Sequence, residues 1–170
     1  MKLLGWLLAP TLLVAATVPT VGQEQDQHPL EGVWRVAEIT TITADGETGN
    51  SKPQPGLFIF TRGHYSAIWT PGSQPRPPYA DTWRPTGEEK IRAYDSIIVN
   101  AGTYESTESR IVTRPILARV PGFGGGKAIY EYELDGDELS LEKVEEYSRD
   151  GVRLTSLDHN RLPLKLVRVE

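Results

Sequence analysis

Short apolar runs separated by glycine-containing turn dipeptides make up most of the sequence from residue 30 onward. Asp45-Gly46, Arg62-Gly63, Gly136-Asp137 and Asp150-Gly151 each supply a residue that accepts a positive φ cheaply, as tight turns between antiparallel strands require. The runs between them are rich in β-branched and aromatic residues, a composition typical of strands. We predict strands at residues 32–42, 56–61, 64–70, 102–105, 110–120, 127–134, 138–147 and 163–169, with a further candidate at 152–156.

This series of strands predicts an all-β domain with about eight antiparallel strands. A sheet of that size exposes unpaired backbone groups at both edges unless it closes on itself, and closure into a barrel removes the edges altogether. A closed β-barrel is therefore the expected architecture.

One segment departs from the strand pattern and predicts a helix. Thr86 and Glu89 form a capping box, and Ile91, Tyr94, Ile97 and Ile98 then recur on one face until Gly102, which gives about three turns. Residues 70–79 precede it and contain too many prolines to pair inside a sheet. A long irregular loop followed by one short helix predicts a lid over an open end of the barrel.

The amino terminus has the features of a secretory signal peptide. Met1 and Lys2 precede an apolar run that extends to Val18, and small residues follow it. We expect cleavage after Gly22, with a cut after Ala16 as the alternative, and hence an exported periplasmic or extracellular protein without stable membrane insertion. Residues 1–22 are then the signal peptide, 23–29 a flexible polar lead, and 30–170 the barrel domain.

Composition excludes several kinds of function. The formal net charge of −5 disfavours nucleic-acid binding, which usually uses a basic surface. The chain has no cysteine, and its three histidines lack the short spacings of a metal site, so we predict no metal, no cofactor and no catalytic set. The carboxylates of Glu142, Glu145 and Glu146, with Lys143 among them, are interpreted as a solvated face.

Four stretches resemble the lipocalin-like domain family of bacteria and fungi, within the calycin superfamily. They are Leu30 to Trp34 with its Gly-Val-Trp sequence, residues 56–67, residues 94–105, and residues 132–141. The resemblance implies an up-and-down barrel and, where family ligands are known, small apolar ones. It also implies that Arg168 on the last strand stacks on Trp34, a pair that we interpret as structural.

Alternation along the strands places several aromatic rings inside the barrel. Tyr130 and Tyr132 lie on the opposite face from Glu131 and Glu133. Tyr65 and Trp69 form a similar stripe, Tyr104 lies on the inner face of its own strand, and Tyr94 lies on the lid. Arg114 shares a face with Val112 and Ile116; inside a barrel it could pair with a ligand carboxylate or carbonyl, whereas at the surface it would simply be solvated. The predicted ligand-binding residues are Tyr65, Trp69, Tyr94, Tyr104, Arg114, Tyr130 and Tyr132.

Three functions are compatible with this pattern. The first is a non-catalytic protein that binds a small apolar or aromatic molecule, with or without a carboxylate or carbonyl. The second is a calycin-type isomerase or cyclase in which tyrosine hydroxyls or His64 move a proton. The third is an interaction module with a packed core, which predicts no cavity and an apolar patch on the outer wall.

Overall fold

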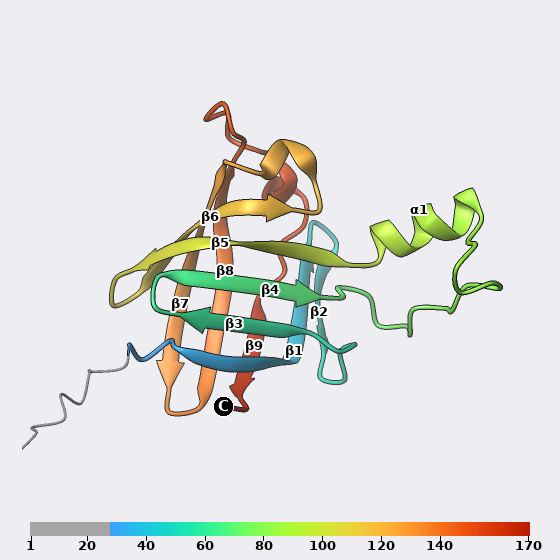
Figure 1. Cartoon of the computed structure of the whole chain (residues 1–170). Coiled ribbons are helices and arrows are strands. Elements are labelled where there is room, and N and C mark those ends of the chain that lie inside the picture. Colours follow the sequence, from blue (N-terminus) through green and yellow to red (C-terminus); the bar gives the residue numbers. More distant parts are fainter. Residues whose placement is uncertain (1–27) are drawn as a thin grey trace, which may run out of the picture.

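The computed structural model describes residues 28–170 and contains nine strands, one α-helix and two 3₁₀-helices within them (Figure 1). The predicted signal peptide and most of the predicted lead lie outside the described residues. Within residues 28–170 no helix is long and apolar enough to cross a membrane. The strands are β1 (Gly32–Thr43), β2 (Gly46–Asn50), β3 (Leu57–Thr61), β4 (His64–Trp69), β5 (Ile98–Ser106), β6 (Arg110–Ala118), β7 (Lys127–Asp135), β8 (Glu138–Tyr147) and β9 (Leu164–Arg168), and the helices are α1 (Gly87–Asp95), η1 (Pro121–Phe123) and η2 (Ser156–Asp158).

Eight of these strands close into an antiparallel up-and-down barrel, as the sequence predicts. Each strand from β3 to β9 pairs with the next along the chain, and β9 returns to pair with β1, which also pairs with β3. The long strand β1 makes this closure possible, because its first half pairs with β3 and its second half with β2. The strand β2 thus extends the wall beyond β3; the sequence analysis did not predict it.

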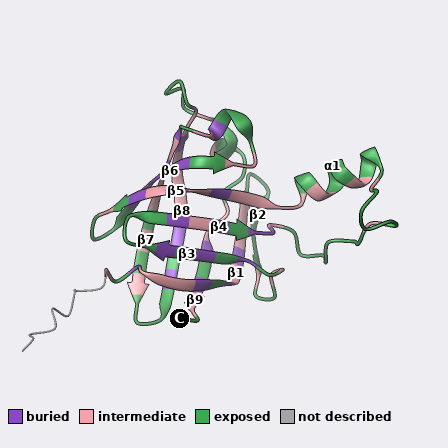
Figure 2. Cartoon of the chain, viewed as in Figure 1, coloured by how far each residue is buried: buried purple, intermediate pink, exposed green. Residues whose placement is uncertain are grey.

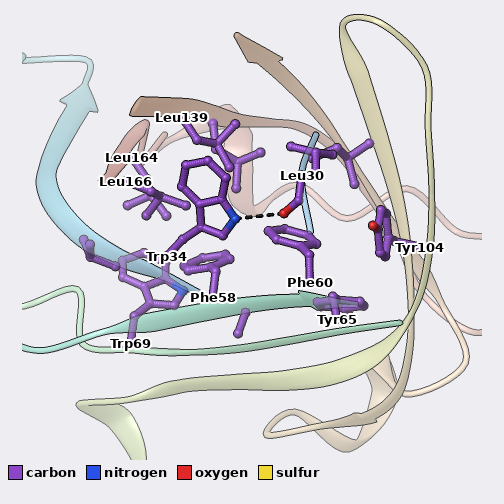
Figure 3. Close-up of a cluster of buried hydrophobic side chains, with 14 of the residues drawn as sticks. Leu30, Trp34, Phe58, Phe60, Tyr65, Trp69, Tyr104, Leu139, Leu164 and Leu166 are labelled. Carbon is purple, nitrogen blue, oxygen red and sulfur yellow. Dashed lines mark hydrogen bonds between the residues drawn. The ribbon is translucent and has the colours of Figure 1, made fainter. Parts of the chain in front are cut away.

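The base of the barrel is filled around Trp34, whose side chain is completely buried (Figure 3). Its indole Nε1 donates a hydrogen bond to the Leu30 carbonyl at 2.9 Å. Phe58, Leu139 and Leu166 pack in the same cluster, because alternation along β3, β8 and β9 directs them inward. This core closes one end of the barrel.

Arg168 covers the Trp34 indole in the way that the resemblance implied. Its guanidinium carbon lies 4.1 Å from the centre of the Trp34 ring, a cation–π contact. The same guanidinium donates to the carbonyls of Glu31 at 2.6 Å and Pro29 at 2.7 Å, and to the Asp137 carboxylate at 3.1 Å. The last strand is thereby fastened to the segment that leads into the first.

The helix begins as predicted but ends earlier and does not cover the barrel. The capping box of Thr86 and Glu89 is present. The helix ends at Asp95, because residues 98–101, which were expected to be helical, form the beginning of β5 instead. No residue of α1 is buried, and the helix projects from the side of the barrel between β4 and β5 (Figures 1 and 2). The prediction of a lid is therefore corrected.

The loop before α1 folds back on the helix instead of on the barrel. Arg76 donates to the Ser96 hydroxyl at 2.9 Å and to the Ala93 carbonyl at 3.3 Å, which satisfies the carboxyl-terminal end of the helix. At the other end the Glu89 carboxylate accepts from the backbone N–H groups of Ala80 and Thr86.

The prediction of a further strand at residues 152–156 is also wrong, because only a single bridge between Arg153 and Tyr147 forms there.

Candidate functional site

A cavity of about 420 Å³ lies inside the barrel between the Trp34 core and the loops that contain η1 and η2. One wall is a row of side chains that face each other across β3, β4, β5 and β6: Phe58, Ala67, Asn100 and Ala118. Three of the four are small or of moderate size, so this row leaves the interior open. The neighbouring row, Phe60, Tyr65, Gly102 and Pro115, brings two large rings inward and fills the space below.

Apolar side chains from the two irregular segments line the mouth of the cavity. Phe123 of η1 is buried against it, and Leu154, Leu157 and Leu162 come from the segment between β8 and β9. Because residues 148–163 form no regular strand, their side chains can move more easily than those on the strands. This end is therefore the more deformable end of the cavity.

Two charged residues of β8 lie together on the cavity wall. The Lys143 ammonium donates to the Glu146 carboxylate at 2.8 Å, and the Ser156 hydroxyl donates to the same carboxylate oxygen at 2.8 Å. The Glu146 side chain is 11% exposed and that of Lys143 29%. The mutual pairing makes burial of both charges tolerable and leaves a polar spot in an otherwise apolar wall.

A β-bulge explains why two residues three positions apart share one face. Tyr130 pairs with Lys143 and Ile129 with Glu145, so Val144 has no partner across β7. The extra residue shifts the alternation by one, which turns Glu146 inward along with Lys143 and Leu141. The interpretation of Glu146 as part of a solvated face is therefore wrong.

At its inner side the cavity adjoins a small space of about 10 Å³ lined by Tyr65, Thr113 and Tyr130, among others. Tyr65 is 5% exposed, and its hydroxyl makes no hydrogen bond within the described part of the chain. Burial raises the pKa of Tyr65 to about 12. Burial also raises the pKa of Tyr130, and the nearby Glu146 carboxylate adds to that effect. Both hydroxyls therefore stay protonated at neutral pH and are available as hydrogen-bond donors.

Comparison with known proteins gives one match. A model of the lipocalin-like domain family matches residues 31–156, which include every strand from β1 to β8. The chain belongs to the lipocalin-like domain family. No curated protein and no solved structure matches it significantly.

The lipocalin-like barrel brings some of the predicted aromatic residues to the cavity. Trp69 and Tyr130 line it directly, and Tyr65 lines the small space at its inner side. Tyr104 lies in the packed core instead, edge-on to Phe60 with ring centres 5.2 Å apart. Tyr132 packs partly against the core and donates to the Thr107 carbonyl at 2.8 Å, beside an outer groove rather than the cavity.

Arg114 lies on the outer surface, which corrects its assignment as a ligand contact. Its side chain is half exposed and lies 3.9 Å from the Glu105 carboxylate. Ala101 pairs with Leu117 and Gly102 with Pro115, so Ile116 is an extra residue in β6. The inward face therefore consists of Ile111, Thr113 and Pro115 before the bulge and Ala118 after it, and unbroken alternation was the wrong assumption.

Tyr94 lies outside the cavity, where it attaches α1 to the barrel rim. Its hydroxyl donates to the Arg119 carbonyl at 2.8 Å, and the Arg119 guanidinium lies 4.7 Å from the centre of its ring. Tyr94 is thus a contact between helix and rim and not a ligand contact.

Sequence reasoning missed the polar residues of this lipocalin-like cavity. Asn100, Lys143, Glu146 and Ser156 all line it. Their sequence signal is weak, because single polar residues in strands usually face solvent and a bulge cannot be located from one sequence. Within residues 28–170 no three His, Asp or Glu side chains gather as metal ligands.

Proposed function

We propose that this lipocalin-like protein binds a small, largely apolar molecule in the barrel cavity. The observation that supports this proposal best is the volume of about 420 Å³, which lies within the usual range of ligand sites at roughly 300–1,000 Å³. The apolar lining from Phe58, Trp69, Phe123 and Leu141 matches such a ligand. The polar side chains of Asn100, Lys143, Glu146 and Ser156 also line the cavity and are available to orient it.

A blocking variant tests this proposal. Ala118→Trp places a large ring in the cavity, whereas Ala93→Trp on the exposed helix adds the same ring outside it. Uncharged N-phenylnaphthylamine would serve as the fluorescent probe, displaced by a panel of fatty acids, retinoids and aromatic metabolites. The proposal expects binding by the unaltered chain and the Ala93→Trp variant, and at least a tenfold loss in Ala118→Trp. Equal binding by all three chains would contradict it.

The natural ligand can be sought without a guess about its identity. Native mass spectrometry of protein purified from its own host would show a bound mass, and Ala118→Trp purified in parallel should lack it. A mass carried equally by both proteins would indicate a ligand outside the cavity.

We further propose export of the mature chain to the periplasm or the extracellular space. The proposal is supported by the basic start at Lys2 and the interrupted apolar run that follows. The intact mass of the exported protein would locate the cut, with a first residue of Gln23 expected. Retention of Met1 in the mature protein would contradict signal cleavage.

An isomerase or cyclase activity is the second candidate, because the Lys143–Glu146 pair and the Tyr130 ring line the same cavity. A carboxylate and a protonated phenol in one cavity can accept and donate protons. Incubation of a host metabolite extract with wild type and Glu146→Gln would reveal turnover that depends on the carboxylate.

The packed-core interaction module is disfavoured by the cavity, although Leu57, Ile59 and Ile68 do form an exposed apolar group on the outer wall.

A further inference from the structure

The Tyr65 hydroxyl is a polar group that the folded chain encloses and leaves without a partner. Its residue is 5% exposed, and no other buried side-chain oxygen or nitrogen in residues 28–170 lacks a hydrogen bond. The neighbouring Thr113 hydroxyl donates to the Ala128 carbonyl at 3.4 Å. Thr113 lies close enough to lower the pKa of Tyr65 against the larger effect of burial, but no hydrogen bond joins the two hydroxyls. Because an enclosed donor without an acceptor is unfavourable, its presence in this position calls for a physical explanation.

The position of this hydroxyl relates it to the cavity. Tyr65 lies beside Phe60 on the neighbouring strand (Figure 3), and its ring borders the space of about 10 Å³ at the inner side of the cavity. Phe58, Ala67, Tyr130 and Leu141 line both this space and the main cavity, so the two adjoin. The small space has room for about one oxygen-sized group.

We propose that the Tyr65 hydroxyl donates a hydrogen bond to a neutral oxygen acceptor at the inner end of the ligand. This inference rests on the proposed function and narrows it: the cavity selects an apolar molecule that has a ketone, ester or hydroxyl oxygen at its leading end. The hydroxyl that is unpaired in the free protein gains its partner when the ligand enters.

The charges around the cavity favour a neutral acceptor over a carboxylate. A buried carboxylate needs a cation, and the space beside Tyr65 is lined by aromatic and aliphatic side chains and one threonine. Lys143 and Arg119 line the main cavity but not the small space; the Lys143 ammonium is paired with Glu146 at 2.8 Å, and the Arg119 guanidinium lies 4.7 Å from the centre of the Tyr94 ring. The Glu146 carboxylate itself would repel a second negative charge in the cavity.

The test compares two ligands of similar shape in two chains. Benzylacetone has a ketone near one end, and butylbenzene is the matched hydrocarbon. Tyr65→Phe removes only the hydroxyl, and Tyr104→Phe is the control, because Tyr104 is a buried ring that does not border the cavity. Isothermal titration calorimetry would give the affinity of each chain for each ligand.

We expect Tyr65→Phe to weaken benzylacetone binding by about 3- to 10-fold, the size of one neutral hydrogen bond, and to leave butylbenzene binding unchanged or tighter. Tyr104→Phe should change neither. Because Tyr65→Phe removes an unpaired buried group, its unfolding midpoint should equal or exceed that of wild type, so a loss of binding cannot be attributed to misfolding.

Other outcomes separate the two proposals. Binding of both ligands with an equal effect of Tyr65→Phe on each would overturn this inference and assign the hydroxyl to a trapped water, while the proposed function would stand. Failure of both ligands to bind wild type would overturn the inference. If N-phenylnaphthylamine also failed to bind, the proposed function would fall as well.

Discussion

Glu146 accepts a hydrogen bond from the Lys143 ammonium at 2.8 Å on the inner wall of the barrel, although an odd number of positions separates them on one strand. On a regular strand these two side chains would point to opposite faces. The unpaired Val144 between them restores a common face. One inserted residue thus converts an apparently surface-exposed pair into a polar part of the wall of the barrel cavity.

Removal of one member of this pair should destabilise the fold more than removal of both. Glu146→Leu leaves a half-buried ammonium without its carboxylate, and we expect a loss of about 1–3 kcal/mol in the free energy of unfolding. The double variant Lys143→Leu with Glu146→Leu should recover most of that loss, because no unpaired charge remains. Urea unfolding of wild type, both single variants and the double variant gives the coupling energy. Additive effects would show that the two residues do not stabilise each other.

Arg168 should contribute to stability and not to ligand binding. Arg168→Ala removes the contact with the Trp34 ring and the bonds to two backbone carbonyls, for an expected loss of about 2–4 kcal/mol. Asp137→Asn is the matched control: its carboxylate is 81% exposed, and the pair should be worth under about 1 kcal/mol. Thermal unfolding measures both. Loss of probe binding in Arg168→Ala protein that is still folded would place Arg168 in the site instead of the base.

Local signals in the sequence were sufficient to predict a barrel, whereas its up-and-down strand order was implied by the resemblance and β2 was not predicted. Turn dipeptides, alternation and the capping box of Thr86 and Glu89 depend on neighbouring residues, and the structure contains them at the predicted places. The Trp34–Arg168 contact was implied by the resemblance and agreed with alternation along the two strands, whereas local signals cannot connect positions with 133 residues between them.

The cavity was predicted only in part, because bulges and packing decide which side chains reach it. Trp69 and Tyr130 lie on strands without an inserted residue of their own, and both line the cavity as alternation predicts. Arg114 lies on a strand with a bulge, so the unbroken alternation assumed for it was wrong; the bulge in β8 likewise turns Glu146 inward from what was interpreted as a solvated face. Tyr94 was misplaced for another reason: an amphipathic pattern indicates a helix but not which surface the helix meets.

Gly102 should not tolerate even a methyl group. It lies opposite the β6 bulge, and a Cβ there would stand 2.0 Å from the Arg114 carbonyl oxygen and 2.7 Å from the Ile116 nitrogen. Both are backbone atoms, so relief requires β5 and β6 to separate, and Gly102→Ala should cost about 1–3 kcal/mol or more. Gly72→Ala, where a Cβ meets nothing within 4 Å, is the control and should be neutral. Chemical unfolding of both variants distinguishes them, and an equally stable Gly102→Ala would mean that the two strands move apart easily.

Alkaline pH should destabilise the protein through its buried tyrosines. Burial raises the pKa of Tyr65 from the ordinary value of 10.0 to about 12, and it raises the pKa of Tyr130 as well. Above pH 10 the unfolded chain releases these protons while the folded chain retains them, so the contribution of these tyrosines to the free energy of unfolding is constant below about pH 10 and falls as the pH rises toward 12. Urea midpoints measured from neutral pH to pH 12 should show this decline, and it should be shallower in Tyr65→Phe, which has one buried phenol fewer. The same measurement on the Tyr104→Phe variant provides a comparison, because burial also raises the pKa of Tyr104. A flat profile, or a decline of the same steepness in wild type and Tyr65→Phe, would show that the Tyr65 hydroxyl meets solvent.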